Sequence, residues 1–236
     1  KKMIVTAMLM SLLGTLLKWD TTLTLAINGL HCHYLDNFMM MYSGRFIWIP
    51  LYLSLFVVMV RKFPLKPVIC NLLVMVVLIT LCDQVVSSGI RPWAYRLRPA
   101  NLDNPISPLV HVVDGYRGGR YGFPSAHAAN CWGAFFFVSY VFRRSVLSYV
   151  LAAWALVMCW SRIYLGVHYL GDVTCGMFVG LVNASVVYYL FQRYLRKYAQ
   201  PFRPKENTCK VYTPAVVCGV ETLSMLGLAF FARFSF

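Results

Sequence analysis

The chain has 236 residues, about the length of one domain, but 59% of them are hydrophobic and only 13% are charged, with a mean hydropathy of +0.62. Soluble proteins average roughly 45–50% apolar and about 25% charged residues, so this composition excludes an ordinary water-soluble domain. The formal net charge of +14 comes with no nucleic-acid-binding motif, and the basic residues stand between apolar stretches. The charge therefore indicates basic cytoplasmic loops or a site for an anionic group.

The first 45 residues divide into two segments of different character. Met3–Leu17 is apolar but short for a membrane span of roughly 20 residues, so a tilted span and an interfacial helix both fit it. Trp19–Gly44 alternates apolar and polar residues, which predicts a surface region that is in part an amphipathic helix.

Six later apolar runs predict membrane helices. They are Phe46–Val60, Pro67–Ile90, Ala128–Phe142, Val146–Ser161, Asp172–Phe191 and Tyr212–Phe234. Only helices and closed barrels satisfy their backbone polar groups in hydrocarbon, and these runs are too long for barrel strands. The sequence therefore predicts an all-α, polytopic transmembrane helix bundle of about six spans, or seven if Met3–Leu17 also spans.

We expect three regions along the chain. Residues 1–45 hold the apolar segment and the amphipathic surface region, and residues 46–192 form the catalytic core. Residues 193–236 form a basic loop and a C-terminal transmembrane helix. Eight cysteines are present without a CxxC pair, and most lie inside apolar runs, so we expect neither a disulfide framework nor a structural zinc.

The charges of the loops predict an orientation in the membrane. Basic residues cluster at 61–66, at 143–144 and at 193–210, in loops that alternate correctly to share one face. By the positive-inside rule this face is cytoplasmic, and the loops at 91–123 and 162–171 then face outward. These outward loops contain six arginines of their own, and an anion-binding site explains them. They are Arg91, Arg96, Arg98, Arg117, Arg120 and Arg162.

Three segments at the outer ends of the expected helices carry reactive side chains. The first runs from Arg91 to Pro99, the second is Pro124-Ser125-Ala126-His127, and the third runs from Ser161 to Asp172. Arginine guanidinium groups grip phosphate oxygens in pairs, and the N-terminus of the helix after Ser125 favours an anion. The two histidines, His127 and His168, suit proton transfer near neutral pH, and Asp172 is placed to fix the tautomer of His168. No set of acids, histidines and cysteines has zinc spacing, so the residues predict metal-free phosphoryl chemistry.

The three segments resemble the signature of the type-2 phosphatidic-acid phosphatase superfamily, which also includes vanadium haloperoxidases and glucose-6-phosphatases. The family pattern is Lys-x6-Arg-Pro, then Pro-Ser-Gly-His, then Ser-Arg-x5-His-x3-Asp. Here it reads Arg91-x6-Arg98-Pro99, then Pro124-Ser125-Ala126-His127, then Ser161-Arg162-x5-His168-x3-Asp172. The resemblance covers roughly residues 46 to 192.

The resemblance implies a role for each matching residue. His168 attacks phosphorus and forms a phosphohistidine, Asp172 orients His168, and His127 protonates the leaving oxygen and then activates water. The resemblance also implies a phosphate-holding set, which is Arg91, Arg98, Ser125, Ala126 (through its backbone N–H) and Arg162. Arg91 and Ala126 depart from the family, which has Lys and Gly there, so an altered phosphate contact is one consequence.

Two further sets of residues allow two readings each. Arg117 and Arg120, just before the second segment, either contact a headgroup or second phosphate or are solvated. Asp83 and Gln84 lie inside an apolar run, where an acid is costly and often functional. Asp83 is also two turns from Arg91, so a structural cap or ion pair is the reading we favour.

The expected activity is metal-independent hydrolysis of a lipid phosphate monoester or diphosphate, with no cofactor and no nucleic acid as partner. By resemblance to bacterial members, the substrates expected first are undecaprenyl diphosphate and a phosphate of lipid A. Phosphatidylglycerol phosphate and phosphatidic acid are others. We expect a bacterial inner-membrane protein whose site faces the periplasm. The alternatives are a vanadate-binding haloperoxidase relative, which the apolar spans oppose, and a non-enzymatic membrane protein on the same scaffold.

Overall fold

The computed structural model describes residues 2–44, 46–198 and 212–232, and within them it contains helices and no strand. A lone antiparallel bridge joins Leu97 to Tyr121. The longer helices are α1 (Lys2–Asn28), α2 (His33–Tyr42), α3 (Ile49–Lys62), α4 (Leu65–Gln84), α6 (Ala126–Phe142), α7 (Ser145–Tyr164), α8 (Leu170–Tyr198) and α9 (Thr213–Leu228). Short elements are a π-helical turn at Val85–Ile90, α5 (Arg91–Ala94), and 3-10 turns at Ser107–Leu109 and Val113–Gly115.

The all-α membrane bundle predicted from the sequence is confirmed, and each of the six expected runs contains a helix. Three helical stretches in the described part of the chain are long and apolar enough to cross a membrane. They are Leu65–Ala94, Ser145–Tyr164 and Leu170–Lys197, with mean hydropathies of 2.3, 1.6 and 1.6. α9 is apolar but shorter. The helix at Leu65–Ala94 extends past the expected end at Ile90, so Arg91 lies in its last turns.

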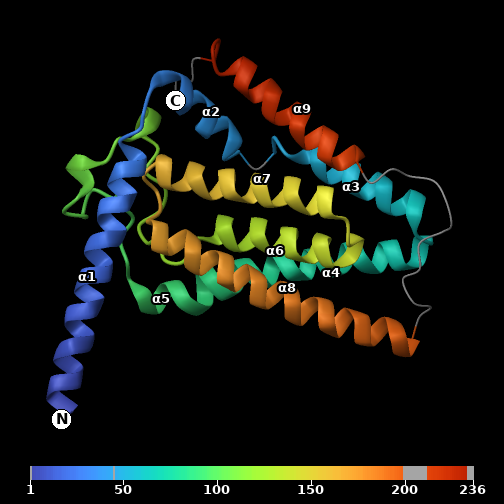
Figure 1. The fold of residues 1–236 in the computed structure, drawn as a ribbon, viewed down its shortest axis with the longest axis horizontal. Helices are drawn as coiled ribbons and strands as arrows, with labels where there is room; N and C mark the ends of the chain where they lie inside the picture. Colours follow the sequence, from blue (N-terminus) through green and yellow to red (C-terminus); the bar gives the residue numbers. More distant parts are fainter. Residues whose placement is uncertain (1, 45, 199–211, 233–236) are drawn as a thin grey trace.

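Helix α6 is the centre of the bundle. It packs against α8, α7 and α4, and Figure 1 shows these four helices running side by side. The α6–α8 contact is close because glycines on α8 face the α6 backbone. A Cβ at Gly180 would lie 2.6 Å from the Ala129 carbonyl oxygen, and one at Gly176 would lie 2.4 Å from that of Ser125. Small residues of this kind let membrane helices approach until their backbones touch.

The N-terminal region is organised differently from its sequence pattern. The apolar segment and the first part of the amphipathic segment form one continuous helix, α1, of 27 residues. Figure 1 shows α1 projecting from the bundle, with only its later part beside the other helices. After a short turn, α2 packs against α7 and α9. α1 therefore brings residues near Asp20 to the body of the protein.

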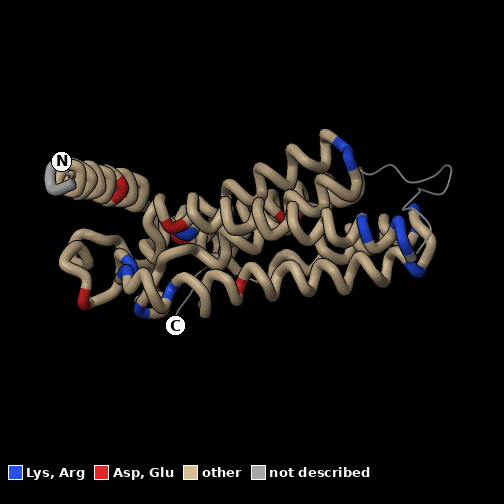
Figure 2. Tube along the Cα trace, turned by 90° about the horizontal axis from the view of Figure 1, so that it is seen from below, with Lys and Arg blue, Asp and Glu red and all other residues tan. Residues whose placement is uncertain are grey.

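The helix ends separate the basic loops from the motif segments. The ends of α3, α6 and α8 that precede basic loops lie together at one end of the bundle, and the starts of α6 and α8 lie at the other (Figure 1). Figure 2 shows a concentration of Lys and Arg at the first end and a smaller group of basic residues at the second. The up-and-down order of the helices thus gathers distant motif segments at one end.

Candidate active site

The three motif segments predicted to converge do converge. Arg91 and Arg98 come from the end of the α4–α5 stretch and the loop after it, and His127 comes from the first turn of α6. His168 comes from the turn between α7 and α8. All four side chains line one cavity of about 830 Å³. This arrangement follows from helix direction, since each segment sits where a helix begins or ends on the same side of the bundle.

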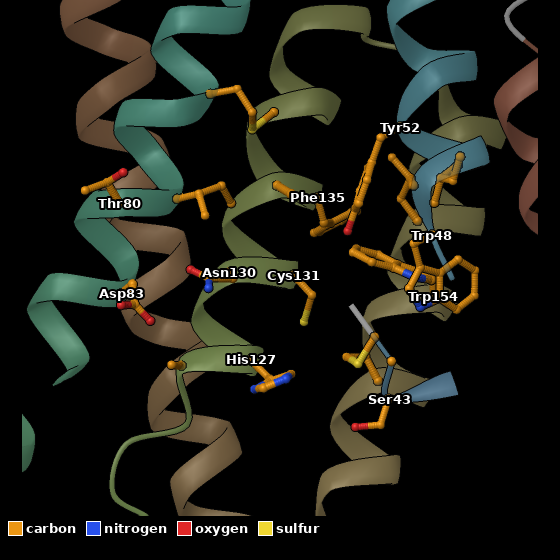
Figure 3. Close-up of a pocket in the computed structure, with 18 of the residues that line it drawn as sticks. Ser43, Trp48, Tyr52, Thr80, Asp83, His127, Asn130, Cys131, Phe135 and Trp154 are labelled. Carbon is orange, nitrogen blue, oxygen red and sulfur yellow. The ribbon is translucent and has the colours of Figure 1, made fainter. Parts of the chain in front are cut away.

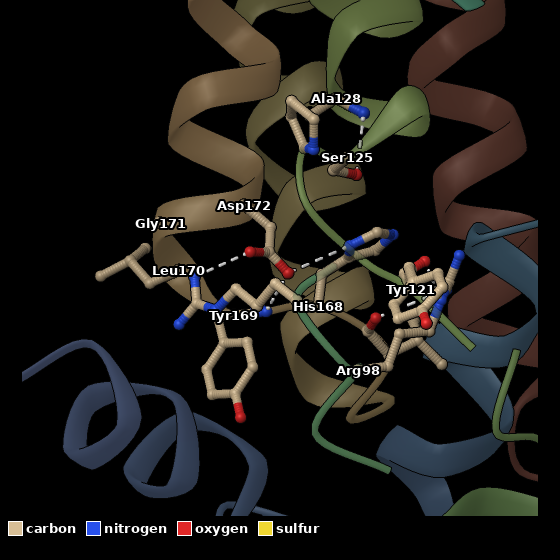
Figure 4. A network of polar contacts seen from close by, with 12 residues as sticks. Arg98, Tyr121, Ser125, Ala128, His168, Tyr169, Leu170, Gly171 and Asp172 are labelled. Carbon is tan, nitrogen blue, oxygen red and sulfur yellow. Dashed lines mark hydrogen bonds and ion pairs between the residues drawn. The ribbon is translucent and has the colours of Figure 1, made fainter. Parts of the chain in front are cut away.

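His168 and Asp172 form the buried centre of the site (Figure 4). His168 is 1% exposed and Asp172 is fully buried. The Nδ1 atom of His168 lies 3.4 Å from Oδ2 of Asp172. The two atoms are close enough for an ion pair, but they are not aligned for a hydrogen bond. Burial, together with the positive charges of Arg98, Arg162 and Arg91, holds the pKa of His168 well below its usual range. The imidazole is therefore neutral near pH 7, as a nitrogen nucleophile must be.

Asp172 is held in place by partners on both of its oxygens. Oδ2 accepts a hydrogen bond from the backbone N–H of Tyr169 at 2.9 Å, and Oδ1 accepts one from Arg96 at 2.9 Å. Arg96 also donates to Oδ2 of Asp20 at 2.6 Å, and its guanidinium lies 3.8 Å from the ring centre of Tyr169. Asp20 in turn accepts from the backbone N–H of Gly171 at 2.8 Å. A chain of contacts thus runs from α1 to the carboxylate beside His168.

Asp20 was not singled out as a site candidate, and Arg96 was named only among the six outward-loop arginines that an anion-binding site explains. Arg96 lies inside the variable spacer of the first motif, so the motif gives it no role. Asp20 lies in no motif, and more than a hundred residues separate it from the second and third motifs. The one available signal was an unpaired acid in the amphipathic segment together with an extra arginine in an outward loop. Their pairing depends on where α1 packs, which spacing along the chain does not encode.

The three expected phosphate-holding arginines lie around His168 with different partners. Arg91 donates from Nη2 to the Pro124 carbonyl oxygen at 3.2 Å, and its buried Nε has no partner in the described part of the protein. Arg98 donates from Nε to the Tyr121 carbonyl oxygen at 3.2 Å. Burial and the neighbouring arginines lower the pKa of Arg98 to about 10, which leaves it charged at neutral pH.

Arg162 is almost fully buried, at 2% exposure. It donates from Nη1 to the hydroxyl of Ser43 and from Nη2 to the hydroxyl of Tyr116 at 3.0 Å. Both partners are neutral, so its positive charge is not cancelled by them. Three like charges held close together in a buried site favour binding of a multiply charged anion. Ser43 and Tyr116 are further site residues that the sequence did not indicate.

Ser125 and Ala126 stand at the start of α6. Ser125 is the N-cap, with its hydroxyl accepting from the N–H of Ala128 at 3.3 Å, and its own N–H donates to the Asp172 carbonyl oxygen at 3.0 Å. Ser125 is therefore tied to α8 as well as to α6. Ala126 is the first helical residue and lines the cavity beside His127. The N–H groups of a first helical turn are oriented toward anions in such a place.

Arg117 and Arg120 lie in the loop before α6 and are engaged with other groups. Arg117 donates to the Ala100 carbonyl oxygen at 2.6 Å and to the Ser107 hydroxyl at 3.2 Å, which pins the loop. Arg120 forms an ion pair with Asp103 at 3.4 Å, in which both side chains are more than 60% exposed. Neither lines the cavity. Across the residues described, no three His, Cys, Asp or Glu side chains are grouped to hold a metal ion.

The cavity extends from these residues into the bundle between α3, α4, α6 and α7. Figure 3 shows His127 at one end and Tyr52, Phe135 and Trp154 deeper among the helices. Its α6 lining repeats at helical spacing from Ala126 to Val138, a rise of about 18 Å. The site therefore opens into a long compartment within the apolar part of the protein.

Comparison with known proteins gives consistent matches. Residues 69–196 match the PAP2 superfamily. The chain is 40% identical over 171 residues to a lipid A 4'-phosphatase of Bacteroides thetaiotaomicron, covering 72% of this chain and 76% of that protein. It is 31% identical over 221 residues to a lipid A 4'-phosphatase of Porphyromonas gingivalis, covering 91% and 90%.

Among solved structures, the fold is similar to that of a transmembrane PAP2-type phosphatidylglycerolphosphate phosphatase from Bacillus subtilis. The TM-score is 0.56, with 21% sequence identity over 79% of this chain and 89% of that chain. At this level of identity the similarity concerns the fold alone. It agrees with the helix bundle predicted from the apolar runs.

Proposed function

The chain belongs to the PAP2 superfamily and is an integral-membrane phosphoric ester hydrolase that acts on lipid phosphates, and we propose that its substrate is the 4'-phosphate of lipid A. The support for this substrate is the 40% and 31% identity to two proteins with that activity in their names. The observation that carries the chemistry is the burial of His168 beside Asp172 and three arginines, which lowers the pKa of its ring.

The proposed reaction proceeds through a phosphohistidine on His168. Because Nδ1 faces Asp172, Nε2 is left to attack phosphorus, and the bond between phosphorus and the lipid oxygen breaks. His127 donates its proton to the departing lipid oxygen. His127 then takes a proton from water as the water oxygen attacks phosphorus, the bond to Nε2 breaks, and inorganic phosphate leaves.

The arginines serve the charged transition state in this proposal. Arg91, Arg98 and Arg162 lie with His168 at one site, where their charges offset the charge that builds on the equatorial phosphate oxygens. The N–H groups at the start of α6, near Ala126, add donors on another side. The Lys-to-Arg departure at Arg91 keeps the charge, and Ala126 fits because its backbone is helical.

We do not extend the proposal to undecaprenyl diphosphate. Arg117 and Arg120, for which the sequence left open a second phosphate, a headgroup or solvent as partner, are engaged with the Ala100 carbonyl oxygen and with Asp103. We also propose that the protein lies in a bacterial inner membrane with the site facing the periplasm. This orientation rests on the Lys and Arg residues at the ends of α3, α6 and α8, which lie at the opposite end of the bundle (Figure 2).

Phosphate release by the purified protein in detergent with EDTA tests the proposal. The assay compares lipid A, phosphatidic acid and undecaprenyl diphosphate, with His168→Ala as the inactive variant. His33→Ala, an exposed histidine at the start of α2, is the matched control. We expect turnover of lipid A that persists in EDTA, survives in the control and is lost in His168→Ala. Equal turnover by His168→Ala would overturn the histidine mechanism, and absence of turnover on any lipid would favour a non-enzymatic role.

A further inference from the structure

The cavity changes character with depth, in three steps. At the outer end it is lined by the arginines and histidines of the candidate site. Next comes a wall of uncharged polar groups and one acid, formed by Thr80, Asp83, Gln84 and Ser87 of the α4 stretch and Asn130 of α6. Beyond it the lining is apolar and aromatic, with Tyr52, Phe135 and Trp154 (Figure 3). The middle step has no part in the reaction described above.

Asp83 is the residue of this wall that needs explaining. It is half-buried within an apolar membrane helix, where an ionisable group is costly. The sequence favoured a structural cap or an ion pair near Arg91, and the ion pair is not formed, since Arg91 donates to the Pro124 carbonyl oxygen instead. Within the described residues Asp83 has no hydrogen bond and no ion pair. Asp83 therefore acts on Arg91 only through its charge and not through a direct contact, and its carboxylate oxygens are left without a hydrogen-bond donor among these residues.

Asn130 lies on the neighbouring wall, one turn into α6 from His127. Its Oδ1 atom is buried and has no hydrogen-bond partner in the described part of the protein. Figure 3 shows Asp83 and Asn130 on adjacent helices, at the same level of the cavity. The two carboxylate oxygens of Asp83 and the amide oxygen of Asn130 thus stand next to the phosphate site without donors from the part of the chain that is described. An ionised carboxylate only accepts hydrogen bonds, so its partner must be a donor.

The possible lipid substrates differ in the hydrogen-bond donors that they carry next to the phosphate. In phosphatidic acid the group next to the phosphate is an esterified glycerol, which offers acceptors and no donor. An isoprenoid phosphate offers neither. An acylated amino sugar offers both hydroxyl and amide N–H donors, followed by acyl chains. Such a lipid has a phosphate, then a sugar ring with hydrogen-bond donors, then hydrocarbon chains. The cavity is lined in the same order, by the arginines and histidines, then the polar wall, then the apolar side chains.

We propose that Asp83 and Asn130 form a headgroup subsite that binds the hydroxyl and amide donors of an acylated amino sugar phosphate. The subsite rests on the proposed function, since it acts on the lipid whose phosphate His168 attacks. Asp83 also repels the phosphate, so the substrate binds only with its phosphate at the arginines and its sugar one turn deeper. The subsite therefore has two effects: it selects for the sugar, and it sets the orientation of the substrate.

The test is the ratio of kcat/KM for two lipids in identical mixed micelles. One is a synthetic diacylated glucosamine 4-phosphate, and the other is phosphatidic acid, which lacks sugar donors. Asp83→Leu and Asn130→Leu remove the acceptors, and Val76→Leu on the lipid-facing side of α4 is the matched control. We expect each cavity variant to lower the sugar-to-glycerol ratio about tenfold or more, because a hydrogen bond to a charged or buried group is lost. The control keeps the wild-type ratio.

A second variant at Asp83 distinguishes loss of the subsite from loss of folding. Asp83→Asn keeps the size of the side chain and removes its charge, and we expect it to lower the ratio several-fold in protein that elutes as the wild type does. A ratio that stays at the wild-type value in all cavity variants overturns the subsite, as does an equal loss on both lipids. Wild-type protein that hydrolyses phosphatidic acid but not the sugar phosphate overturns the subsite and leaves lipid phosphatase activity standing. Hydrolysis of neither lipid overturns the proposed function itself, and the subsite with it.

Discussion

Asp20 on α1 and Asp172 at the start of α8 are joined by a single guanidinium group. Arg96 donates to Asp20 at 2.6 Å and to Asp172 at 2.9 Å. Arg96 is 21% exposed at its side chain, whereas Asp172 is fully buried. The N-terminal helix therefore reaches His168 indirectly, through the carboxylate that lies beside it.

This relationship predicts that Asp20 is a positioning residue. Asp20→Asn weakens one of the two ion pairs of Arg96, so Asp172 and His168 are held less firmly, and we expect kcat to fall about tenfold while KM changes little. Steady-state kinetics with a lipid phosphate measures the split, and Asp20→Glu should restore part of kcat. Asp103→Asn is the matched control, because Asp103 pairs with Arg120 at an exposed position. A rise in KM at unchanged kcat would contradict the positioning role.

His127 is predicted to act as an acid on the leaving group. We expect His127→Ala to reduce kcat for a lipid phosphate about 10²- to 10⁴-fold, because an alkoxide needs a proton to depart. The loss should be much smaller for p-nitrophenyl phosphate, whose leaving group is a stable anion. Parallel assays of both substrates measure the difference. Equal losses on both would show that His127 contributes something other than this proton.

The lowered pKa of His168 predicts how stability depends on pH. An unfolded histidine takes up a proton near pH 6.5, whereas the buried ring, beside Arg98, Arg162 and Arg91, does not. The unfolded state then binds more protons, so stability is retained above about pH 6.5 and falls as the pH drops below it, by up to about 1.4 kcal/mol per pH unit.

Denaturation of wild type and His168→Gln in detergent, from about pH 7.5 to about pH 5.5, checks this sign. The free energy of unfolding of the wild type should fall more steeply with acid than that of the variant, which lacks the titrating ring. Parallel curves for the two proteins would show that protonation of His168 does not differ between its folded and unfolded states.

The contact between α6 and α8 predicts a strong effect of a single methyl group. Gly180→Ala places a Cβ within 2.6 Å of the Ala129 carbonyl oxygen and 2.7 Å of the Gly133 nitrogen, both backbone atoms that have little room to move. We expect a loss of about 1–3 kcal/mol in stability. Activity should fall as well, because separating the helices weakens the 3.0 Å bond from Ser125 to Asp172.

Gly219→Ala is the control for that substitution. Gly219 lies on α9 with no atom within 4 Å of the added methyl, so the change should leave stability equal or slightly higher. Thermal unfolding and phosphate release on the two variants complete the comparison. A Gly180→Ala protein as stable as Gly219→Ala would contradict the close helix contact.

The local features of this protein could be predicted from its sequence. Apolar runs predicted the helix bundle because a membrane span must be apolar along its whole length, and α6 and α7 begin and end within three residues of the expected bounds. The reactive residues His127, His168 and Asp172 were identified because the chemistry needs these types at fixed spacing. The expected roles of these residues, and the division of the chain into three regions, stay predictions.

Only the tertiary structure decided which further residues support that centre. Asp20 and Arg96 are 76 positions apart, and Ser43 and Arg162 are 119 positions apart, so no spacing rule relates either pair. Whether Asp83 pairs with Arg91 likewise depends on the direction of the arginine side chain, which packing at Pro124 sets. Periodicity along a chain determines helices and the faces they present, whereas the partners of a polar side chain depend on which helices pack together and at what height.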